Sequence, residues 1–178
     1  ISDIDLLAMD IPEVEWLIRP LFPKGSLDML AAPSHQHKSM LALRMAICVA
    51  QGDPLFGELE TTKTNVLFVQ EEDSVQMQKQ RYNLLLQDGE QPGGVFFIIE
   101  SGRMIDVKWA QEIIQICLER GIGFVILDSL RALHLQNENE SHLMQPIINT
   151  LRLLTRAGLT VLFIHHHKKS DGVEIGNE

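Results

Sequence analysis

The chain has 178 residues, of which 45% are hydrophobic, so it is long enough for one domain with a substantial core. Its 15 Lys and Arg against 24 Asp and Glu give a net charge of −9, which excludes a nucleic-acid footprint over the whole surface. The longest apolar runs are far shorter than the roughly 20 residues of a membrane-spanning helix, and no signal-peptide pattern opens the chain. We therefore expect a cytoplasmic protein without membrane contact, in which any contact with DNA is local.

The chain order of elements predicts an α/β fold. Residues 1–25 are expected to form an N-terminal arm, extended over residues 16–25 by its prolines. Short β-rich runs then alternate with amphipathic stretches, which is typical of a mostly parallel sheet with helices on both faces. The expected strands are residues 27–31, 65–70, 95–100, 124–128 and 160–164. The expected helices are residues 40–50, 74–86, 107–120 and 143–156. Cys48 and Cys117 fall within helical patterns, which predicts buried, reduced side chains.

An irregular phosphate loop follows the first strand. The segment Ala32-Pro33-Ser34-His35-Gln36-His37-Lys38-Ser39 precedes an apolar helix, which is the position and length of a GxxxxGK(S/T) loop. Both glycines are replaced, by Ala32 and His37, but the Lys38 amine can reach the β- and γ-phosphates and the Ser39 hydroxyl can ligate Mg²⁺. The helix adds N–H groups and the positive end of its dipole. The alternative is that Ser34 or Ser39 only caps this helix.

Acidic residues follow the second strand. Residues 70–73 read Gln-Glu-Glu-Asp, at the sheet edge where ligands bind in open parallel α/β folds. One of these acids can orient an attacking water. The alternative is that they lie in the first turn of the next helix and complement its dipole.

The fourth strand, residues 124–128, is four apolar residues closed by Asp128. This is the Walker B form, in which the carboxylate holds Mg²⁺ through its water shell. A buried strand needs no acid at its tip for stability, so a functional role is favoured.

The last strand runs into His165, His166 and His167. Adjacent side chains of a strand point to opposite faces, so only His165 and His167 can share a site, and no Cys or acid at ligand spacing accompanies them. We favour a polar sensor of the γ-phosphate over a metal site. The alternative is a solvated strand end.

Together these residues resemble RecA-like AAA ATPases, particularly the RepA-type hexameric replicative helicases of plasmids and phages, with DnaB helicases and RecA more distant. The resemblance spans residues 16–169. It rests on Lys38-Ser39, residues 66–73, Asp128-Ser129-Leu130-Arg131, residues 137–140 and Phe163-Ile164-His165-His166. It implies that residues 26–178 form a RecA-like nucleotide-binding core that is truncated at its C-terminus.

The resemblance also implies roles for particular residues. Glu72 would polarise the attacking water, because the family's acid directly precedes an Asp, and Asp128 would be the Walker B acid. His165 would report the state of the γ-phosphate, and Ser39 and Asp128 would hold the metal. The implied nucleotide-binding residues are Ser34, His35, Gln36, His37, Lys38, Ser39 and Met40.

The expected function is that of an ATP- and Mg²⁺-dependent P-loop ATPase, the core of a DNA replication or repair helicase. Such a helicase works as a homo-oligomeric ring on single-stranded DNA. The alternative is a catalytically degenerate RecA-fold module that acts in assembling a DNA-processing complex, which Ala32 and His37 favour because they crowd the loop. A dinucleotide-binding Rossmann enzyme is disfavoured because the chain lacks the GxGxxG turn.

Overall fold

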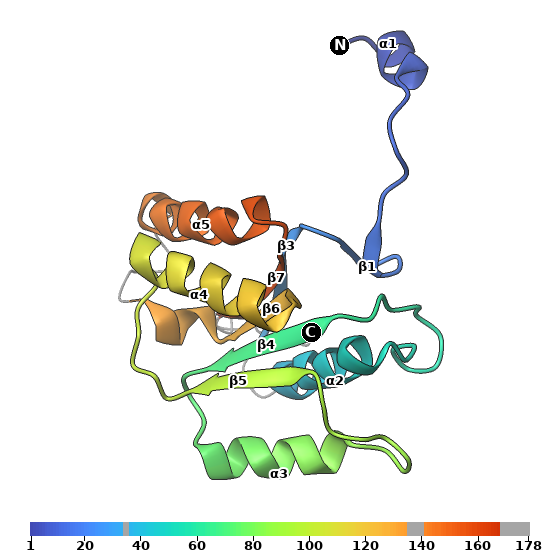
Figure 1. Cartoon of the computed structure of the whole chain (residues 1–178). Coiled ribbons are helices and arrows are strands. Elements are labelled where there is room, and N and C mark those ends of the chain that lie inside the picture. Colours follow the sequence, from blue (N-terminus) through green and yellow to red (C-terminus); the bar gives the residue numbers. More distant parts are fainter. Residues whose placement is uncertain (34–35, 135–140, 168–178) are drawn as a thin grey trace, which may run out of the picture.

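The computed structural model describes residues 1–33, 36–134 and 141–167, and it contains a five-stranded parallel sheet (Figure 1). The order of the strands across the sheet is β3-β7-β6-β4-β5. Their bounds are β3 Leu27–Pro33, β4 Asn65–Gln70, β5 Val95–Ile99, β6 Ile122–Asp128 and β7 Thr160–His167. All five predicted strands are confirmed, and so is the α/β fold class.

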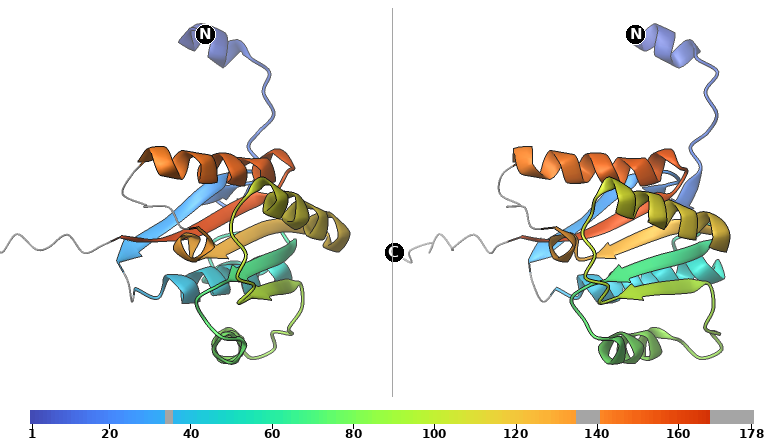
Figure 2. Two further views of the ribbon diagram at one scale, coloured as in Figure 1. Left: turned by 90° about the vertical axis from the view of Figure 1, so that its left-hand side faces the viewer. Right: turned by 60° about the vertical axis from the view of Figure 1, so that its left-hand side comes forward.

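Helices cover both faces of the sheet (Figure 2). Their bounds are α2 Lys38–Gln51, α3 Val75–Leu85, α4 Val107–Arg120 and α5 Ser141–Arg156, with a 3₁₀ helix η1 at Leu130–Leu133. Successive strand residues point to opposite faces, so Phe124 and Ile126 of β6 pack with α2, whereas Val125 and Leu127 pack with α4 and α5. The four predicted helices are confirmed, with ends shifted by up to two residues.

The N-terminal segment has two parts. Helix α1, Asp3–Ala8, stands apart from the body of the protein (Figure 1). Strands β1, Trp16–Ile18, and β2, Phe22–Pro23, form a small antiparallel ribbon. The prediction that residues 16–25 are simply extended is therefore wrong. Leu17 and Ile18 are buried against α2, and the backbone of residues 17–19 bonds to that of residues 60–62.

Cys48 and Cys117 are both buried free thiols, as predicted. Among the residues that the structure describes, no helix is both long enough and apolar enough to cross a membrane.

Candidate functional site

Parallel strands bring four chain segments to one edge of the sheet. Gln70 at the end of β4 is paired in register with Asp128 at the end of β6, and Ala31 of β3 is paired with His165 of β7. The loop before α2, the turn before α3 and the end of β6 therefore meet at the carboxyl edge, where α/β sheets bind ligands.

Lys38 is held against the end of β3. Its side chain is 4% exposed, and its Nζ donates hydrogen bonds to the carbonyl oxygens of Ala32 at 2.8 Å and Pro33 at 2.7 Å. Burial lowers the pKa of the Lys38 amine, and the nearby carboxylates of Asp128 and Glu72 oppose that effect. The amine is thus positioned at the first turn of a 14-residue helix, whose N-terminal N–H groups attract anions.

His37 occupies the position of the second glycine of a phosphate loop, and its backbone adopts a glycine-like conformation. Its φ is 55° and its ψ is 24°, in the left-handed region. It precedes the first residue of α2, and its exposed side chain makes no capping hydrogen bond. His37 therefore keeps the backbone conformation of a glycine, at a cost of roughly 1 kcal/mol in backbone strain.

Ser39 is not a helix cap, so that alternative is wrong for this residue: the N-cap is His37, and Ser39 is the second residue of α2. The Ser39 side chain lies near the carboxylate of Asp128 and acts to lower its pKa. The start of α2 and the end of β6 thus bring a hydroxyl and a carboxylate close together.

Asp128 is only 2% exposed, and burial raises its pKa to about 6. The nearby Ser39 side chain opposes this shift, while the Glu72 and Asp73 carboxylates reinforce it. Gln70 Nε2 donates to Oδ2 of Asp128 and to Oδ2 of Asp73, each at 3.0 Å. One buried amide therefore orients two carboxylates at the edge.

The two glutamates after β4 point to different neighbours. Ser129, directly after Asp128, donates a hydrogen bond from Oγ to Oε1 of Glu72. Glu71 instead accepts hydrogen bonds from the Ser101 hydroxyl and the Gly102 backbone N–H, in the loop after β5. Glu72 thus lies toward the Lys38 loop, and Glu71 lies toward the outer strand.

These acids do not belong to the helix that follows them. Helix α3 begins at Val75, Ser74 caps it by accepting from the Met77 N–H, and its first turn contains no acid. The alternative that the acids complement the dipole from within its first turn is therefore wrong.

The structure thus brings four of the predicted site residues together, namely Lys38, Ser39, Glu72 and Asp128. His165 lies half-buried in β7 beside Ala31, and its pairing places it at the same edge. Gln36 and His37 are exposed in the loop, and Met40 is half-buried in α2. Ser34, His35 and residues 137–140 lie outside the described residues.

Sequence reasoning missed Gln70, Ser129 and Arg81. Gln70 and Ser129 are almost fully buried, and Arg81 forms an ion pair with Asp73. One pattern in the sequence could have identified Gln70: it is a polar residue at the end of an otherwise apolar strand. A buried amide needs hydrogen-bond partners, so such a residue is expected to bind neighbouring polar groups.

The donor chemistry fits Mg²⁺. Ser39 and Asp128 offer a hydroxyl and a carboxylate oxygen near each other, and Mg²⁺ prefers oxygen ligands. The described residues contain no group of three or more His, Cys, Asp or Glu that could form a complete metal cage. A magnesium bound by one or two protein groups, with phosphate and water completing its shell, matches this arrangement.

Comparison with known proteins agrees with this geometry. Residues 2–172 match the AAA domain family. A KaiC-like protein from the hyperthermophilic archaeon Pyrococcus horikoshii OT3 has a similar fold, with a TM-score of 0.61 and 17% sequence identity. The similarity covers 85% of this chain and 65% of the archaeal chain. The chain belongs to the AAA domain family and has the fold of a RecA-like P-loop ATPase, a group that generally binds ATP with Mg²⁺.

Proposed function

We propose that this chain binds ATP with Mg²⁺ at the Lys38 loop and hydrolyses it, as the core of a helicase-type ATPase in DNA replication or repair. The observation that carries this proposal is the convergence of Lys38, Ser39, Glu72 and Asp128 at the carboxyl edge. An amine and a hydroxyl from the start of α2, a carboxylate from the turn after β4 and another from the end of β6 suit phosphoryl transfer.

In the proposed complex, Lys38 exchanges its bonds to the Ala32 and Pro33 carbonyls for the β- and γ-phosphates. The backbone N–H groups of residues 34–40 complete the cradle at the helix N-terminus. Ser39 and Asp128 would hold Mg²⁺, which neutralises charge on the phosphates.

Glu72 is the residue that would orient water toward the γ-phosphorus. Attack forms a bond from the water oxygen to phosphorus and breaks the bond to the β-phosphate oxygen, which yields ADP and phosphate. Two contacts support this role: Ser129 donates to its carboxylate, and its own backbone N–H donates to Gln70 Oε1 at 2.9 Å. His165 would sense the phosphate from the adjoining strand.

The resemblance to RepA-type hexameric helicases supports a further part of the proposal. Several copies would form a ring that moves along single-stranded DNA. Because the net charge is −9, the contact with DNA would be confined to local segments.

A second candidate function is a nucleotide-controlled or nucleotide-free scaffold. The observation that favours it is the state of Lys38, whose amine already donates hydrogen bonds to two carbonyl groups at the end of β3. His37 adds a side chain where a glycine would let phosphate approach closely.

Calorimetric titration of ATP with Mg²⁺ tests the first candidate against the second. The wild-type chain should bind in the micromolar range, Lys38→Ala should lose binding, and the exposed Lys79→Ala should match the wild type. Glu72→Gln should bind ATP yet hydrolyse it far more slowly. If the wild type does not bind at millimolar ATP, or if Lys38→Ala binds equally well while remaining folded by circular dichroism, the scaffold is the better description.

A further inference from the structure

Helix α3 covers the edge of the sheet incompletely. Of its 11 residues only Gln78 is buried, although a helix that packs on a sheet normally buries an apolar stripe. The stripe of α3 that faces β5 has residues three or four positions apart on one side of the helix, namely Val75, Gln78, Lys79, Tyr82 and Asn83. Because only Val75 and Tyr82 in this stripe are apolar, a groove remains between α3 and β5.

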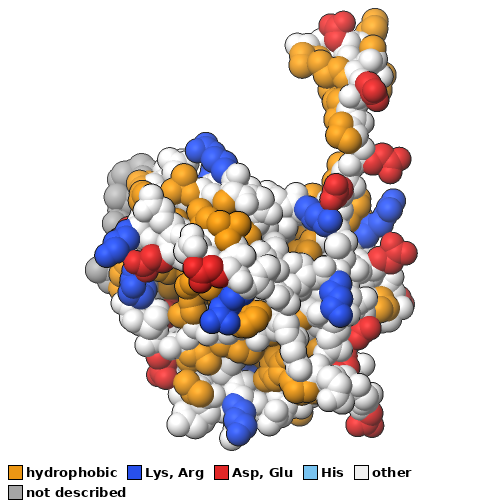
Figure 3. All heavy atoms as spheres, viewed as in Figure 1, with side chains coloured by type: hydrophobic (Ala, Val, Ile, Leu, Met, Phe, Trp, Pro, Cys, Tyr) orange, Lys and Arg blue, Asp and Glu red, His pale blue; other side chains and the backbone are white. Residues whose placement is uncertain are grey.

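The floor of the groove is aromatic and anchored in the core. Phe97 of β5 meets Tyr82 edge to face, with ring centroids 5.6 Å apart. The Phe97 ring also lies 5.9 Å from that of the buried Phe68, and Ile99 extends the floor along β5. Figure 3 shows hydrophobic side chains gathered where β5 faces α3. A floor fixed in this way is in place before a ligand binds.

The groove has the size of a small-molecule site. Its volume is about 240 Å³, just below the roughly 300–1,000 Å³ of pockets for drug-sized ligands. It is too small for a protein interface, which buries at least roughly 1,000 Å² in total. The lining that the groove exposes is almost entirely apolar, so its occupant needs an apolar body.

Gln78 adds one polar requirement. Its side chain lines the groove, the residue is 3% exposed, and its Nε2 has no hydrogen-bond partner among the described residues. An unsatisfied buried donor is costly, and an acceptor that enters the groove would remove that cost. The terminal torsion of a glutamine is soft, so the amide can turn its N–H groups toward such an acceptor.

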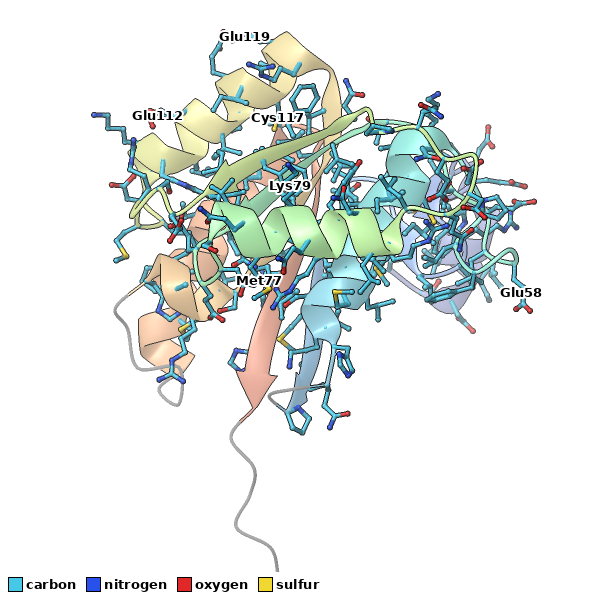
Figure 4. The ribbon with its side chains drawn as sticks, turned by 90° about the horizontal axis from the view of Figure 1, so that it is seen from below. Glu58, Met77, Lys79, Glu112, Cys117 and Glu119 are labelled. Carbon is cyan, nitrogen blue, oxygen red and sulfur yellow. The ribbon has the colours of Figure 1, made fainter. Side chains whose placement is uncertain are left out.

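The charge at the groove favours an anion. The lining includes Lys79 and no Asp or Glu. Figure 4 shows Lys79 on the β5 side of α3, whereas Met77 lies on the opposite side. Arg81, the other cation of α3, is paired with Asp73, but Lys79 forms no ion pair within the part of the chain that the structure describes. A carboxylate matches both Lys79 and Gln78, because it is negatively charged and its two oxygens accept hydrogen bonds.

We propose that the groove between α3 and β5 binds a small carboxylic acid with an apolar body. The body lies on Tyr82 and Phe97, and the carboxylate sits at the α3 border. One of its oxygens accepts from Gln78, and the other faces the ammonium group of Lys79. The groove shares no lining residue with the site at the Lys38 loop, so binding there does not depend on the proposed ATPase function.

NMR titration of the isotope-labelled 178-residue chain with octanoate, without nucleotide, tests the site. Amide signals should shift over residues 75–83 and 95–99. The Kd should be about 1 mM or below, as expected for a ligand of roughly ten non-hydrogen atoms. No shift in the millimolar range, or shifts confined to other segments, overturns the proposal. Because no nucleotide is present, the result is independent of whether the chain binds ATP.

Ligands with the same apolar body and different heads test the role of charge. Octylamine should bind at least about tenfold more weakly than octanoate, because its cation faces Lys79 and cannot accept from Gln78. The neutral 1-octanol should fall between them. Equal affinity for octanoate and octylamine would mean that the groove selects only the apolar body, which overturns the proposed carboxylate.

Two pairs of variants distinguish the groove from the rest of the surface. Lys79→Gln should weaken octanoate binding by about threefold to fivefold, as expected for an exposed ion pair. Its control is Lys108→Gln, at an exposed lysine of α4, which should have no effect. Val75→Asp places a carboxylate in the lining and should weaken binding at least about tenfold. Leu84→Asp should not, since Leu84 is exposed on α3 outside the lining. Equal effects within either pair contradict the proposed site.

Gln78→Met gives a signature that unfolding cannot imitate. The variant should keep or raise the Tm, because an apolar side chain of similar size replaces an unsatisfied buried donor. It should weaken octanoate binding by about tenfold and 1-octanol binding less, because hydrogen bonds to charged acceptors are the stronger ones. Unchanged affinity for octanoate, or a lower Tm, overturns the role of Gln78.

Discussion

The hydroxyl of Ser129 donates a hydrogen bond to the carboxylate of Glu72, which joins the end of β6 to the turn after β4. A similar contact involves the neighbouring glutamate: the hydroxyl of Ser101 donates a hydrogen bond to the carboxylate of Glu71. Two neighbouring glutamates are thus each held by one serine, in different loops. Substituting each serine in turn therefore tests the role of Glu72 while the Glu72 carboxylate stays in the protein.

Ser129→Ala should lower kcat for ATP hydrolysis by about tenfold and leave ATP affinity nearly unchanged, because Glu72 loses orientation but binding groups stay in place. Ser101→Ala is the matched control and should leave kcat nearly unaltered. Steady-state kinetics with phosphate detection measures both. Equal losses in the two variants, or a larger loss in Ser101→Ala, would indicate that Glu71 is the acid that orients water.

His37→Gly should increase the free energy of unfolding by about 0.5–1 kcal/mol, because glycine adopts a φ of 55° without strain. Removing the imidazole should also keep or improve ATP affinity, since the phosphate can approach the backbone more closely. Urea denaturation and calorimetry measure these two effects.

Gln36→Gly is the control for that substitution. Gln36 is exposed in the same loop and does not have a positive φ. Glycine at position 36 should leave the free energy of unfolding unchanged or lower it, because glycine gives the unfolded chain more conformational freedom. If His37→Gly weakens ATP binding, the imidazole is itself a phosphate ligand.

The sequence predicted the sheet well because its inner strands, such as β4 and β6, are short apolar runs buried on both faces. The strand ending in Asp128 shows why: a run of four apolar residues closed by a carboxylate leaves few alternatives. It also predicted that Lys38, Ser39 and Asp128 lie at one edge, since the carboxyl ends of parallel strands share an edge.

Other features depend on contacts between distant segments and could not be predicted from the sequence alone. The pairing of Ser129 with Glu72 joins residues far apart in the chain. The ribbon of β1 and β2 arises because Leu17 and Ile18 cover α2, which local proline patterns do not reveal. The arm, the sensor role of His165 and the course of the phosphate loop at Ser34 and His35 stay predictions.

Both cysteines should resist thiol reagents in the folded protein. Burial raises the pKa of Cys117 to about 12, and burial also raises that of Cys48. At about pH 8 an ordinary thiol is partly ionised and reacts quickly, whereas these two should react only after unfolding. Labelling in native buffer and in concentrated guanidinium, followed by mass spectrometry, measures this. Rapid native labelling of Cys117 would contradict the packing of α4 against β6.

Asp128→Asn should stabilise the folded protein at neutral pH while abolishing the proposed metal ligand. Burial raises the pKa of Asp128 to about 6, above its ordinary value of 3.8. The folded state therefore binds the proton more tightly than the unfolded state does. The resulting stability is complete below about pH 4 and is lost as the pH rises through about 6.

The wild type should accordingly lose on the order of 3 kcal/mol of unfolding free energy over this range through Asp128 alone. The Asn variant should lack that loss, so its advantage grows from acidic to neutral pH. Urea denaturation of both proteins in the presence of a chelator, which removes divalent cations that would bind the carboxylate, measures the difference. If the variant is less stable than the wild type at neutral pH, the buried carboxylate is stabilised by Gln70 and Ser39 more strongly than burial opposes it.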